Sequence, residues 1–369
     1  MKILYDQQIF SFQDYGGISR YFYELASRVK QTNNQVLVDG KYSNNVYSNK
    51  LKKDTKQFLL RFNFPHKNVV MFYLNSILDS KNLKKWNFDV LHATYYHPYF
   101  LNKMNGRPYV VTVHDLTHEL YEKDVGGLQT QTKKFKKYVI QGANHIIAVS
   151  ENTKNDLVKI YKIPQNKITV IYHGNSFEDI VPQYVKNLPK SYLLYVGNRS
   201  GYKNFRLFVK ATSSVLKEDN NLFLVCAGGG KFSREENKLL SELKISNQVK
   251  QISFKNDNEL AYIYKNALVY ILPSLYEGFG MTALEAFSMG CPVVASDTSS
   301  IPEVCGRAVL YINPENADSI RSGIKKVLDD NKLSENLVKL GFGQVKKFSW
   351  KKTTRDTLLI YNKIVRNGR

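Results

Sequence analysis

Residues 272–290 read LPSLYEGFGMTALEAFSMG and pass from an apolar run through a glycine loop into a helical pattern. The apolar run ends near Leu272, and a helix is expected from Thr282 onward. Glycines let the backbone approach a ligand closely, and the free N–H groups at a helix start attract anions. Thr282 can cap this helix or serve as an additional donor. The stretch therefore predicts a phosphate-binding loop beyond the end of a strand.

Two glutamates belong to this stretch, with seven residues between them. Glu277 is in the loop and Glu285 is on the helix. One carboxylate can face a sugar while the other accepts from the paired hydroxyls of a ribose. The alternative makes Glu277 a loop cap and Glu285 a solvated helix residue. The flanking Gly-Phe-Gly and the apolar strand favour a ligand-binding role for both.

Short β-rich runs alternate with helical patterns on both sides of this stretch, which predicts an α/β fold with parallel sheets. In such sheets, ligands bind beyond the carboxyl ends of the strands. The expected strands are 2–5, 35–39, 90–93, 109–114, 145–149, 168–171, 192–196, 222–227, 249–254, 267–272, 293–296 and 308–312. The expected helices are 19–30, 152–161, 205–218, 235–243, 259–266, 282–289, 318–329 and 350–365.

A polar segment with Pro182 and Pro189 divides the chain into two similar halves. The expected domains are 1–178 and 191–349, joined by a linker over 179–190. A final helical segment, 350–369, follows the last strand.

A second glycine-containing turn follows the expected strand 192–196 and reads Gly197-Asn198-Arg199-Ser-Gly-Tyr-Lys203-Asn204. Two cations on such a turn can neutralise a diphosphate. The alternative is an ordinary solvated turn, because the chain holds 53 basic residues. Downstream, the glycines of Gly228-Gly-Gly230 are spaced too closely for a dinucleotide fingerprint and are expected to turn the backbone near the base of a bound nucleotide.

Four further features lie in the first half. Gly16 and Gly17 precede a helix, either as a turn plus N-cap with glycine at positive φ or as a close backbone approach to a ligand. His114 ends a strand and is expected to point into a crevice. His92, Tyr95 and His97 are candidates to line the same crevice, and His173-Gly174 ends the last strand of this half.

The 272–290 stretch resembles the signature of retaining glycosyltransferases of the GT-B fold, the group that includes glycogen and sucrose synthases. Glu277 and Glu285 match the E-x7-E motif of that group, and residues 290–297 and 301–304 match its continuation. The resemblance covers essentially the whole chain. It implies two Rossmann-like domains, an acceptor-binding one followed by a nucleotide-sugar-binding one, with the last helix returning to the first domain.

The resemblance also implies roles for single residues. Glu277 would contact the donor sugar, Glu285 the nucleotide ribose, and His114 the sugar from the other domain. Arg199 and Lys203 would hold the diphosphate and stabilise the leaving nucleotide in a front-face reaction without a protein nucleophile. The expected catalytic residues are His114, Arg199, Lys203 and Glu277. The expected donor-binding residues are Gly16, Gly17, Gly197, Asn198, Phe279, Gly280, Met281, Thr282 and Glu285.

The segments YGGISRYF and GNRSGYKNF look most like bacterial mannosyl- and rhamnosyltransferases of surface-polysaccharide assembly. This favours a GDP-sugar of the mannose type as donor, and an oligosaccharide or polyprenyl-diphosphate-linked acceptor. The nucleotide sugar is a substrate, and no cofactor is expected. No metal is expected either, because no Asp-x-Asp follows an apolar strand and the basic pair can supply the charge.

The charge balance points to anionic partners. The chain of 369 residues holds 53 Lys+Arg against 32 Asp+Glu, a formal net charge of +21. Residues 1–180 carry 25 basic and 15 acidic residues, and residues 181–369 carry 28 basic and 17 acidic ones. The basic excess, +10 and +11, is therefore nearly equal in the two halves. Basic runs at 50–53, 84–85 and 133–137, with aromatics Phe58 and Phe62 expected to be exposed, form either a solvated helix face or a surface for anionic lipid.

The cysteines, the N-terminal residues and the length of the apolar runs limit the expected cellular location. Cys226, Cys291 and Cys305 form no disulfide or zinc pattern and are expected to be buried thiols in a reduced compartment. The N-terminus becomes charged too early for a signal peptide, and no run of about 18 apolar residues exists. A cytoplasmic protein, at most peripheral on the inner face of the membrane, is expected.

Three other functions stay open. The alternatives are a UDP-sugar-dependent transferase with a soluble acceptor, a GT-B nucleotide-sugar epimerase and a basic nucleic-acid-binding protein. No recognition motif accompanies the lysines, so nucleic acid is not the expected partner. Release of nucleoside diphosphate only when an acceptor is present separates a transferase from an epimerase.

Overall fold

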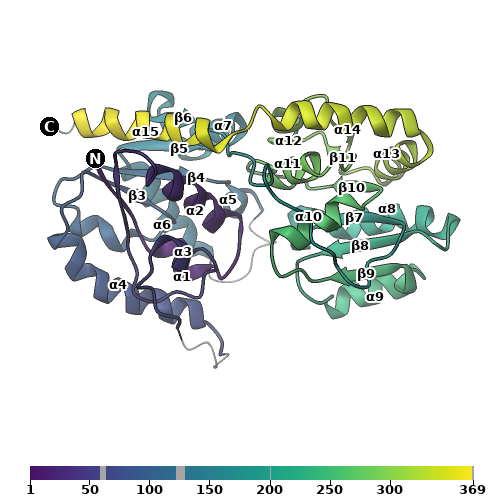
Figure 1. The fold of residues 1–369 in the computed structure, drawn as a ribbon, viewed down its shortest axis with the longest axis horizontal. Coiled ribbons are helices and arrows are strands. Elements are labelled where there is room, and N and C mark those ends of the chain that lie inside the picture. The colour runs from purple at the N-terminus through teal and green to yellow at the C-terminus, as the bar shows by residue number, and fades with distance from the viewer. Residues whose placement is uncertain (59–63, 122–128, 200, 368–369) are drawn as a thin grey trace. The chain divides into compact units, whose positions relative to one another are not determined.

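A computed structural model describes residues 1–58, 64–121, 129–199 and 201–367, without the side chains of 80–82, 84–85 and 129–131. The described chain divides into two compact units, each of which is described by itself (Figure 1). Unit 1 comprises Met1–Leu116, Gly127–Gly174 and Ser349–Arg369. Unit 2 comprises Thr117–Gly126 and Asn175–Phe348.

Unit 1 is built on a six-stranded parallel sheet in the order β2-β1-β3-β4-β5-β6. Its strands are β1 (Lys2–Tyr5), β2 (Gln35–Val38), β3 (Val90–Ala93), β4 (Tyr109–Val113), β5 (His145–Ala148) and β6 (Ile168–Val170). Its helices are α1 (Gln8–Phe12), α2 (Gly17–Val29), α3 (Ser48–Leu51), α4 (Lys67–Lys85), η1 (Pro98–Lys103), α6 (Gln129–Gly142), α7 (Glu151–Tyr161), η3 (Gln165–Lys167) and α15 (Trp350–Asn367).

Unit 2 holds a second six-stranded parallel sheet, in the order β12-β11-β10-β7-β8-β9. Its strands are β7 (Tyr192–Val196), β8 (Phe223–Ala227), β9 (Val249–Ile252), β10 (Val269–Leu272), β11 (Val293–Ser296) and β12 (Leu310–Ile312). Its helices are α5 (Thr117–Leu120), η4 (Gly201–Lys203), α8 (Phe205–Glu218), α9 (Arg234–Glu242), η5 (Ser246–Gln248), α10 (Asp257–Lys265), α11 (Met281–Ser288), α12 (Ile301–Cys305), α13 (Ala317–Asp329) and α14 (Asn331–Val345).

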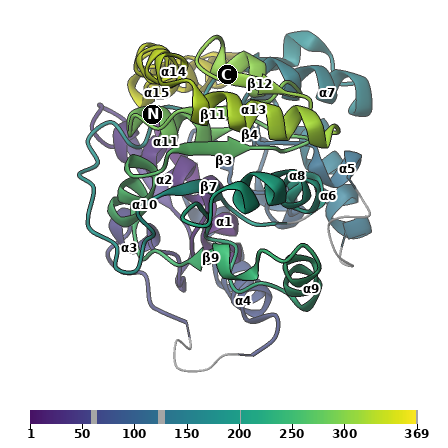
Figure 2. The ribbon, with the colours of Figure 1, turned by 90° about the vertical axis from the view of Figure 1, so that its right-hand side faces the viewer.

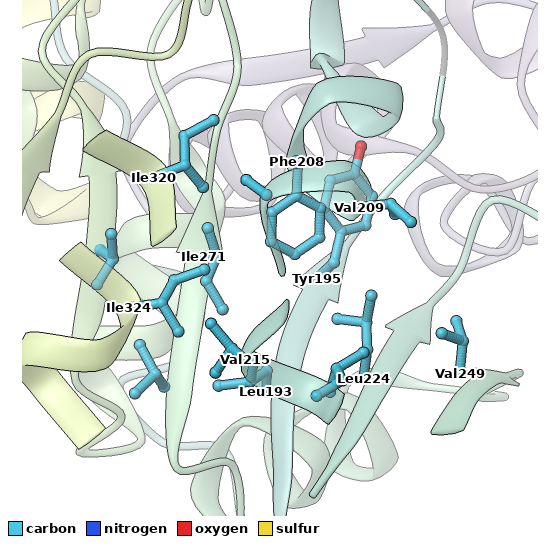
Figure 3. Close-up of a cluster of buried hydrophobic side chains, with 14 of the residues drawn as sticks. Leu193, Tyr195, Phe208, Val209, Val215, Leu224, Val249, Ile271, Ile320 and Ile324 are labelled. Atoms are coloured by element: carbon cyan, nitrogen blue, oxygen red, sulfur yellow. The ribbon is translucent and has the colours of Figure 1, made fainter. Parts of the chain in front are cut away.

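Each sheet is covered by helices on both faces, as the near-continuous apolar strands require. In unit 2, α8 and α13 lie side by side over one face (Figure 2). Phe208 and Val209 of α8 and Ile320 and Ile324 of α13 pack there against Leu193 of β7 and neighbouring strands (Figure 3). This packing fixes the strand ends that carry the site loops.

Local signals set the helix boundaries. Ser150 caps α7 by accepting from the backbone N–H of Thr153, and Ser233 and Glu236 form a capping box at α9. The observed elements match the predicted strands and helices to within a few residues. Helices α1, α3, α4, α5, α6, α12 and α14 were not predicted.

The domain boundaries differ from the expected ones. The expected linker 179–190 is part of unit 2, where the Gln183 N–H donates to the carbonyl oxygen of Asn258 at 2.9 Å. The last helix, α15, packs on α2 and β5 of unit 1, as predicted. Gly174 permits this return, because a Cβ there would lie 2.2 Å from the backbone nitrogen of Trp350.

The basic runs are less uniform than expected. Lys136 is buried, and its Nζ donates to the Asp115 carbonyl at 2.8 Å. Phe58, expected to be exposed, is buried against Tyr42 with ring centroids 5.8 Å apart. Phe62 and the side chains of Lys84 and Lys85 lie outside the described residues.

Candidate active site

The carboxyl ends of β7 and β10, which are neighbours in the sheet, bring two predicted site loops of unit 2 together. Lys203 follows β7 and Glu277 follows β10. The Lys203 Nζ donates to both carboxylate oxygens of Glu277, at 2.7 and 2.9 Å. Both side chains are largely buried, with exposed fractions of 22% and 12%. A cation and a carboxylate are thus held at the edge where a parallel sheet binds its ligand.

The Glu277 loop is anchored by three serines that sequence reasoning missed. The Ser274 hydroxyl donates to Glu277 Oε1 at 2.7 Å, and the Glu277 N–H donates to Ser299 Oγ at 2.9 Å. The Ser300 hydroxyl donates to the Glu277 carbonyl at 2.8 Å. The offset of three residues between Ser274 and Glu277 is a turn signal, whereas nothing in the sequence pairs Ser299 with Glu277.

Helix α11 begins directly after this loop. Gly280 has a left-handed backbone, with φ of 99°, and precedes Met281 and Thr282 at the helix start. The first turn has no acidic residue. Phe279 is buried against the ring of Phe348, with centroids 5.7 Å apart. The N–H groups at this helix start therefore form an anion-attracting end next to Lys203 and Glu277.

Glu285 is on α11 and is buried rather than solvated, which removes the alternative of an exposed helix residue. The Tyr264 hydroxyl donates to Glu285 Oε2 at 3.1 Å. Tyr264 is itself buried on α10. A buried carboxylate held by a hydroxyl is suited to accept from ligand hydroxyls at the same helix.

Arg199 does not join Lys203. Its Nε donates to Glu236 Oε1 at 2.7 Å, and its terminal nitrogens donate to four carbonyls of the next loop. The acceptors are Gly228, Gly229, Gly230 and Lys231, at 3.0–3.3 Å. The guanidinium also stacks on Phe232, 4.7 Å from the ring centroid. Its charge and donors are thus engaged by groups of the protein in this structure, and its contact with a diphosphate stays a prediction.

The cavity beside Arg199 carries charges of both signs. It measures about 290 Å³ and is lined by three cationic side chains, Arg199, Arg206 and Lys238, and by three carboxylates, Glu235, Glu236 and Glu242. Arg199 is already paired with Glu236 there, with Nε 2.7 Å from Oε1. In the preceding turn, Gly197 has a φ of 117°, and the Asn198 carbonyl accepts from the Tyr195 hydroxyl at 2.6 Å.

At the carboxyl edge of the unit 1 sheet, His114 follows β4. Its ring lies against Tyr21 and His173, with centroids 5.0 and 5.5 Å away. Its Nε2 is buried and has no hydrogen-bond partner within the described part of the chain. Burial lowers the pKa of His114 to about 4, helped by the positive charge of Lys136. A neutral imidazole with an unmet polar atom points to a ligand contact.

His92 does not line a site, contrary to prediction. It lies within β3, fully buried, and both ring nitrogens have partners. Nδ1 is 2.5 Å from the Tyr361 hydroxyl, and Nε2 is 2.8 Å from Thr112 Oγ1. Burial lowers its pKa to about 3. His92 is therefore a core histidine that ties β3 to α15.

Tyr95 and His97, by contrast, line a small cavity. It measures about 70 Å³ and is otherwise lined by Phe12, Tyr96, Thr132 and Phe135. His97 is fixed there, because its Nδ1 accepts from the Tyr99 N–H at 3.2 Å. Aromatic walls with a few polar atoms can contact one face of a sugar ring or an apolar chain, although the cavity is smaller than a typical ligand pocket.

Gly16 and Gly17 begin α2, but neither has the positive φ expected of a glycine turn. Gly16 is extended, with φ of 172°, and Gly17 is the first helical residue. Gln13 Oε1 accepts from the Ser19 N–H at 3.3 Å and so takes up one of the first helical donors. The helix start therefore lies at the carboxyl edge of β1 without a strained turn.

Within the described residues, no group of three or more His, Cys, Asp or Glu is arranged to hold a metal ion. The three cysteines are buried and free, as predicted. Burial raises the pKa of the Cys226 thiol to about 12, so it is inert at neutral pH.

Comparison with known proteins decides the family. Residues 176–342 match the model of glycosyl transferases group 1, and residues 15–177 match that of Glycosyltransferase Family 4. The chain is a GT-B glycosyltransferase of this group.

Its relatives differ in how much of the chain they match. An uncharacterised glycosyltransferase of Methanocaldococcus jannaschii is 29% identical over 74% of this chain and 75% of its own length. The O-antigen chain mannosyltransferase RfbU of Salmonella typhimurium is 29% identical, over 60% of this chain and 61% of RfbU. Sucrose-phosphate synthase from Thermosynechococcus elongatus has the same fold, with a TM-score of 0.79, 20% identity and 99% of each chain covered.

Proposed function

We propose that this glycosyltransferase moves a hexose from a nucleoside-diphosphate sugar to a sugar hydroxyl and retains the anomeric configuration. The bond between the sugar C1 and the diphosphate oxygen breaks, and a bond from C1 to the acceptor oxygen forms on the same face. The acceptor proton passes to the leaving phosphate oxygen. The contact between Lys203 and Glu277, beside the start of α11, carries this proposal.

Each group has a distinct task. The Lys203 ammonium stabilises the charge that develops on the departing diphosphate, together with the N–H groups at the start of α11. Glu277 orients Lys203 and accepts from sugar hydroxyls, while Glu285 binds the ribose. On unit 1, we assign the sugar contact to His114, because its imidazole is neutral at pH 7 and its Nε2 is available to a ligand. The reaction needs no metal in this scheme, since the Lys203 ammonium and the N–H groups at the start of α11 supply the positive charge.

The donor and acceptor follow from the relatives and the sequence. The similarity to RfbU, an O-antigen chain mannosyltransferase, supports mannose from a GDP-sugar and a place in surface-polysaccharide synthesis. We propose a lipid-linked oligosaccharide as the acceptor, used at the inner face of the cytoplasmic membrane. In the described chain, no helix is long and apolar enough to cross a bilayer.

Turnover tests this function. Nucleoside diphosphates and nucleotide sugars are first screened by thermal shift, because a bound ligand stabilises the fold. The stabilising donor is then incubated with acceptor oligosaccharide and a chelator. We expect nucleoside diphosphate to be released only with acceptor present, and the product to keep the anomeric configuration of the donor.

Lys203→Ala is expected to lower kcat by about 10²–10³, as loss of a transition-state donor does. Lys210→Ala, a change at an exposed lysine on α8, is the matched control and should retain full turnover. Full activity of Lys203→Ala would contradict the assigned role. Loss of turnover on chelation would contradict the metal-free scheme.

A further inference from the structure

Helix α4 is apolar on two opposite faces, and one of them is exposed in the described part of the chain. At about 100° per residue, five large side chains form a single stripe along the helix. They are 40–67% exposed. This set, the α4 stripe, consists of Val70, Tyr73, Leu74, Ile77 and Leu78. An apolar face of this length on one helix marks an interaction surface.

The opposite face fixes how α4 is rotated. Phe72 is buried and stacks on Phe12, with ring centroids 4.6 Å apart. The buried Asn75 donates from Nδ2 to Ser11 Oγ at 3.0 Å and to the Tyr42 carbonyl at 2.8 Å. The stripe therefore cannot turn inward without breaking these contacts. The packing of unit 1 therefore keeps the stripe exposed.

The chain around the stripe is cationic. Residues 55–88 hold six basic residues and a single acidic one, Asp79, which is buried. Helix α6 contains four lysines and no acidic residue, and Lys134 and Lys137 are exposed on it. His97 links the two helices, because its ring contacts Phe72 of α4 at 4.8 Å and Phe135 of α6 at 4.8 Å.

We propose that the α4 stripe docks unit 1 onto a bilayer that contains anionic lipid. Apolar side chains enter the interface between headgroups and acyl chains, while surrounding lysines meet the lipid phosphates. Charge favours a bilayer over a second copy of the chain as the partner of the α4 stripe. Two copies meeting at α4 would bring Lys67, Lys134 and Lys137 of each copy towards one another. The one carboxylate of the 55–88 segment is buried, and the exposed Asp14 already accepts from Asn68 Nδ2 at the start of α4, at 3.4 Å.

The docking surface lies next to the small aromatic cavity. His97, which lines that cavity, contacts Tyr73 of the stripe with centroids 6.1 Å apart. A bilayer at α4 therefore places a lipid-linked acceptor within reach of Tyr95 and His97. The docking surface rests on the proposed membrane location, whereas the donor chemistry of unit 2 is independent of it.

Vesicle flotation of the 369-residue chain tests the surface. Vesicles of phosphatidylglycerol and phosphatidylethanolamine in equal parts are compared with vesicles of phosphatidylcholine alone. We expect binding to the first kind, weakened by salt, and at least about tenfold weaker binding by the Leu74→Glu/Ile77→Glu double variant. The control is Leu359→Glu, which places the same charge at an exposed apolar position of α15 in the same unit.

Insertion is tested separately with tryptophan substitutions. Ile77→Trp is expected to show a blue-shifted emission on anionic vesicles, and Leu359→Trp is not. Lys134→Glu/Lys137→Glu should weaken binding to anionic vesicles without changing the melting temperature.

Equal flotation of wild type and Leu74→Glu/Ile77→Glu would overturn the α4 assignment and leave the membrane location standing. No flotation of wild type would overturn both. A wild-type dimer that the same substitutions convert to monomer, without vesicle binding, would replace the bilayer by a second copy. Transfer to a soluble acceptor should be unchanged in the double variant, so a failure of the proposed chemistry is recognised independently.

Discussion

Lys203 and Arg199 are four residues apart in one loop, yet their charges have different partners. Lys203 meets Glu277 of the donor loop, and Arg199 meets Glu236 and the carbonyls of the glycine loop. Gly229 explains the tight packing of the two loops. It has a φ of 69°, and a Cβ there would lie 2.6 Å from the Gly197 carbonyl oxygen. In this structure Arg199 therefore holds the loop after β8 through its backbone carbonyls.

This difference predicts separate kinetic effects. Arg199→Ala is expected to raise the KM for the donor about tenfold or more, because the four carbonyls lose their shared donor and the loop shifts. Its kcat should fall far less than that of Lys203→Ala. Steady-state kinetics of both variants, with Lys238→Ala as control, measures this. Lys238 is exposed on α9 and forms a surface pair with Glu242, whose loss should change little.

The opposite pattern would reassign Arg199. If its alanine variant lost kcat and kept KM, the guanidinium would reach the leaving group during turnover. Glu236→Gln adds a second check, since it preserves an acceptor for Arg199 while removing the charge, and should give a smaller rise in KM than Arg199→Ala.

Sequence reasoning could place Lys203 and Glu277 together because their strands are parallel neighbours that end at one edge. It could not predict the partner of Arg199. That partner, Glu236, is 37 residues away, and the carbonyls depend on three consecutive glycines with left-handed backbone. The prediction that His92 lines a site was wrong for a similar reason, since one of its two hydrogen-bond partners, Tyr361, is 269 residues away.

At the scale of elements, the strands were predictable because each is a short apolar run between turn signals. Helix α4 was not, since apolar residues on both faces remove the 3.6-residue period. Its only acidic residue, Asp79, faces Asp39 in the interior. Burial and the neighbouring carboxyl of Asp39 raise the pKa of Asp79 to about 9.

Asp79 makes stability depend on pH. Its pKa in the folded chain lies above the ordinary value of 3.8, so the folded chain keeps a proton that the unfolded chain has released. Stability therefore falls as pH rises from about 4 towards about 9. Asp79→Asn mimics the protonated form and should melt at a higher temperature than wild type at pH 8, with the difference shrinking as pH falls to 4.

Thermal melts between pH 4 and pH 8 check this expectation. Asp54→Asn, at an exposed position outside α4, is the control and should follow the wild-type profile. An Asp79→Asn variant that is less stable than wild type at pH 8 would show that Asp79 is ionised and paired, contrary to its surroundings.

At the scale of the whole molecule, unit 1 is completed by the last residues of the chain. Helix α15 adds Trp350, Ile360, Tyr361 and Ile364 to the core formed by β1, β3 and α2. The final helix could be predicted from its pattern, and its return from the family resemblance. The close packing of its first residue, Trp350, on Gly174 could not be predicted, because it depends on the absence of a Cβ at Gly174.

Because α15 belongs to unit 1, damage to its buried face should be confined to that unit. Tyr361 is fully buried, and its hydroxyl contacts His92 at 2.5 Å and Tyr5 at 3.3 Å. Tyr361→Ala is expected to cost unit 1 about 3–5 kcal/mol through the cavity it leaves. Tyr361→Phe should cost about 1–3 kcal/mol, since the buried Nδ1 of His92 then lacks its hydrogen-bond partner.

Calorimetry with and without nucleoside diphosphate separates the units, because ligand raises only the transition of the unit that binds it. We expect Tyr361→Ala to lower the transition that ligand leaves unchanged, and to leave the ligand-sensitive transition in place. Leu359→Ala, exposed on the same helix, should move neither. If both transitions fell together in Tyr361→Ala, the two units would unfold as one cooperative body, and the donor site would depend on the C-terminal helix for its stability.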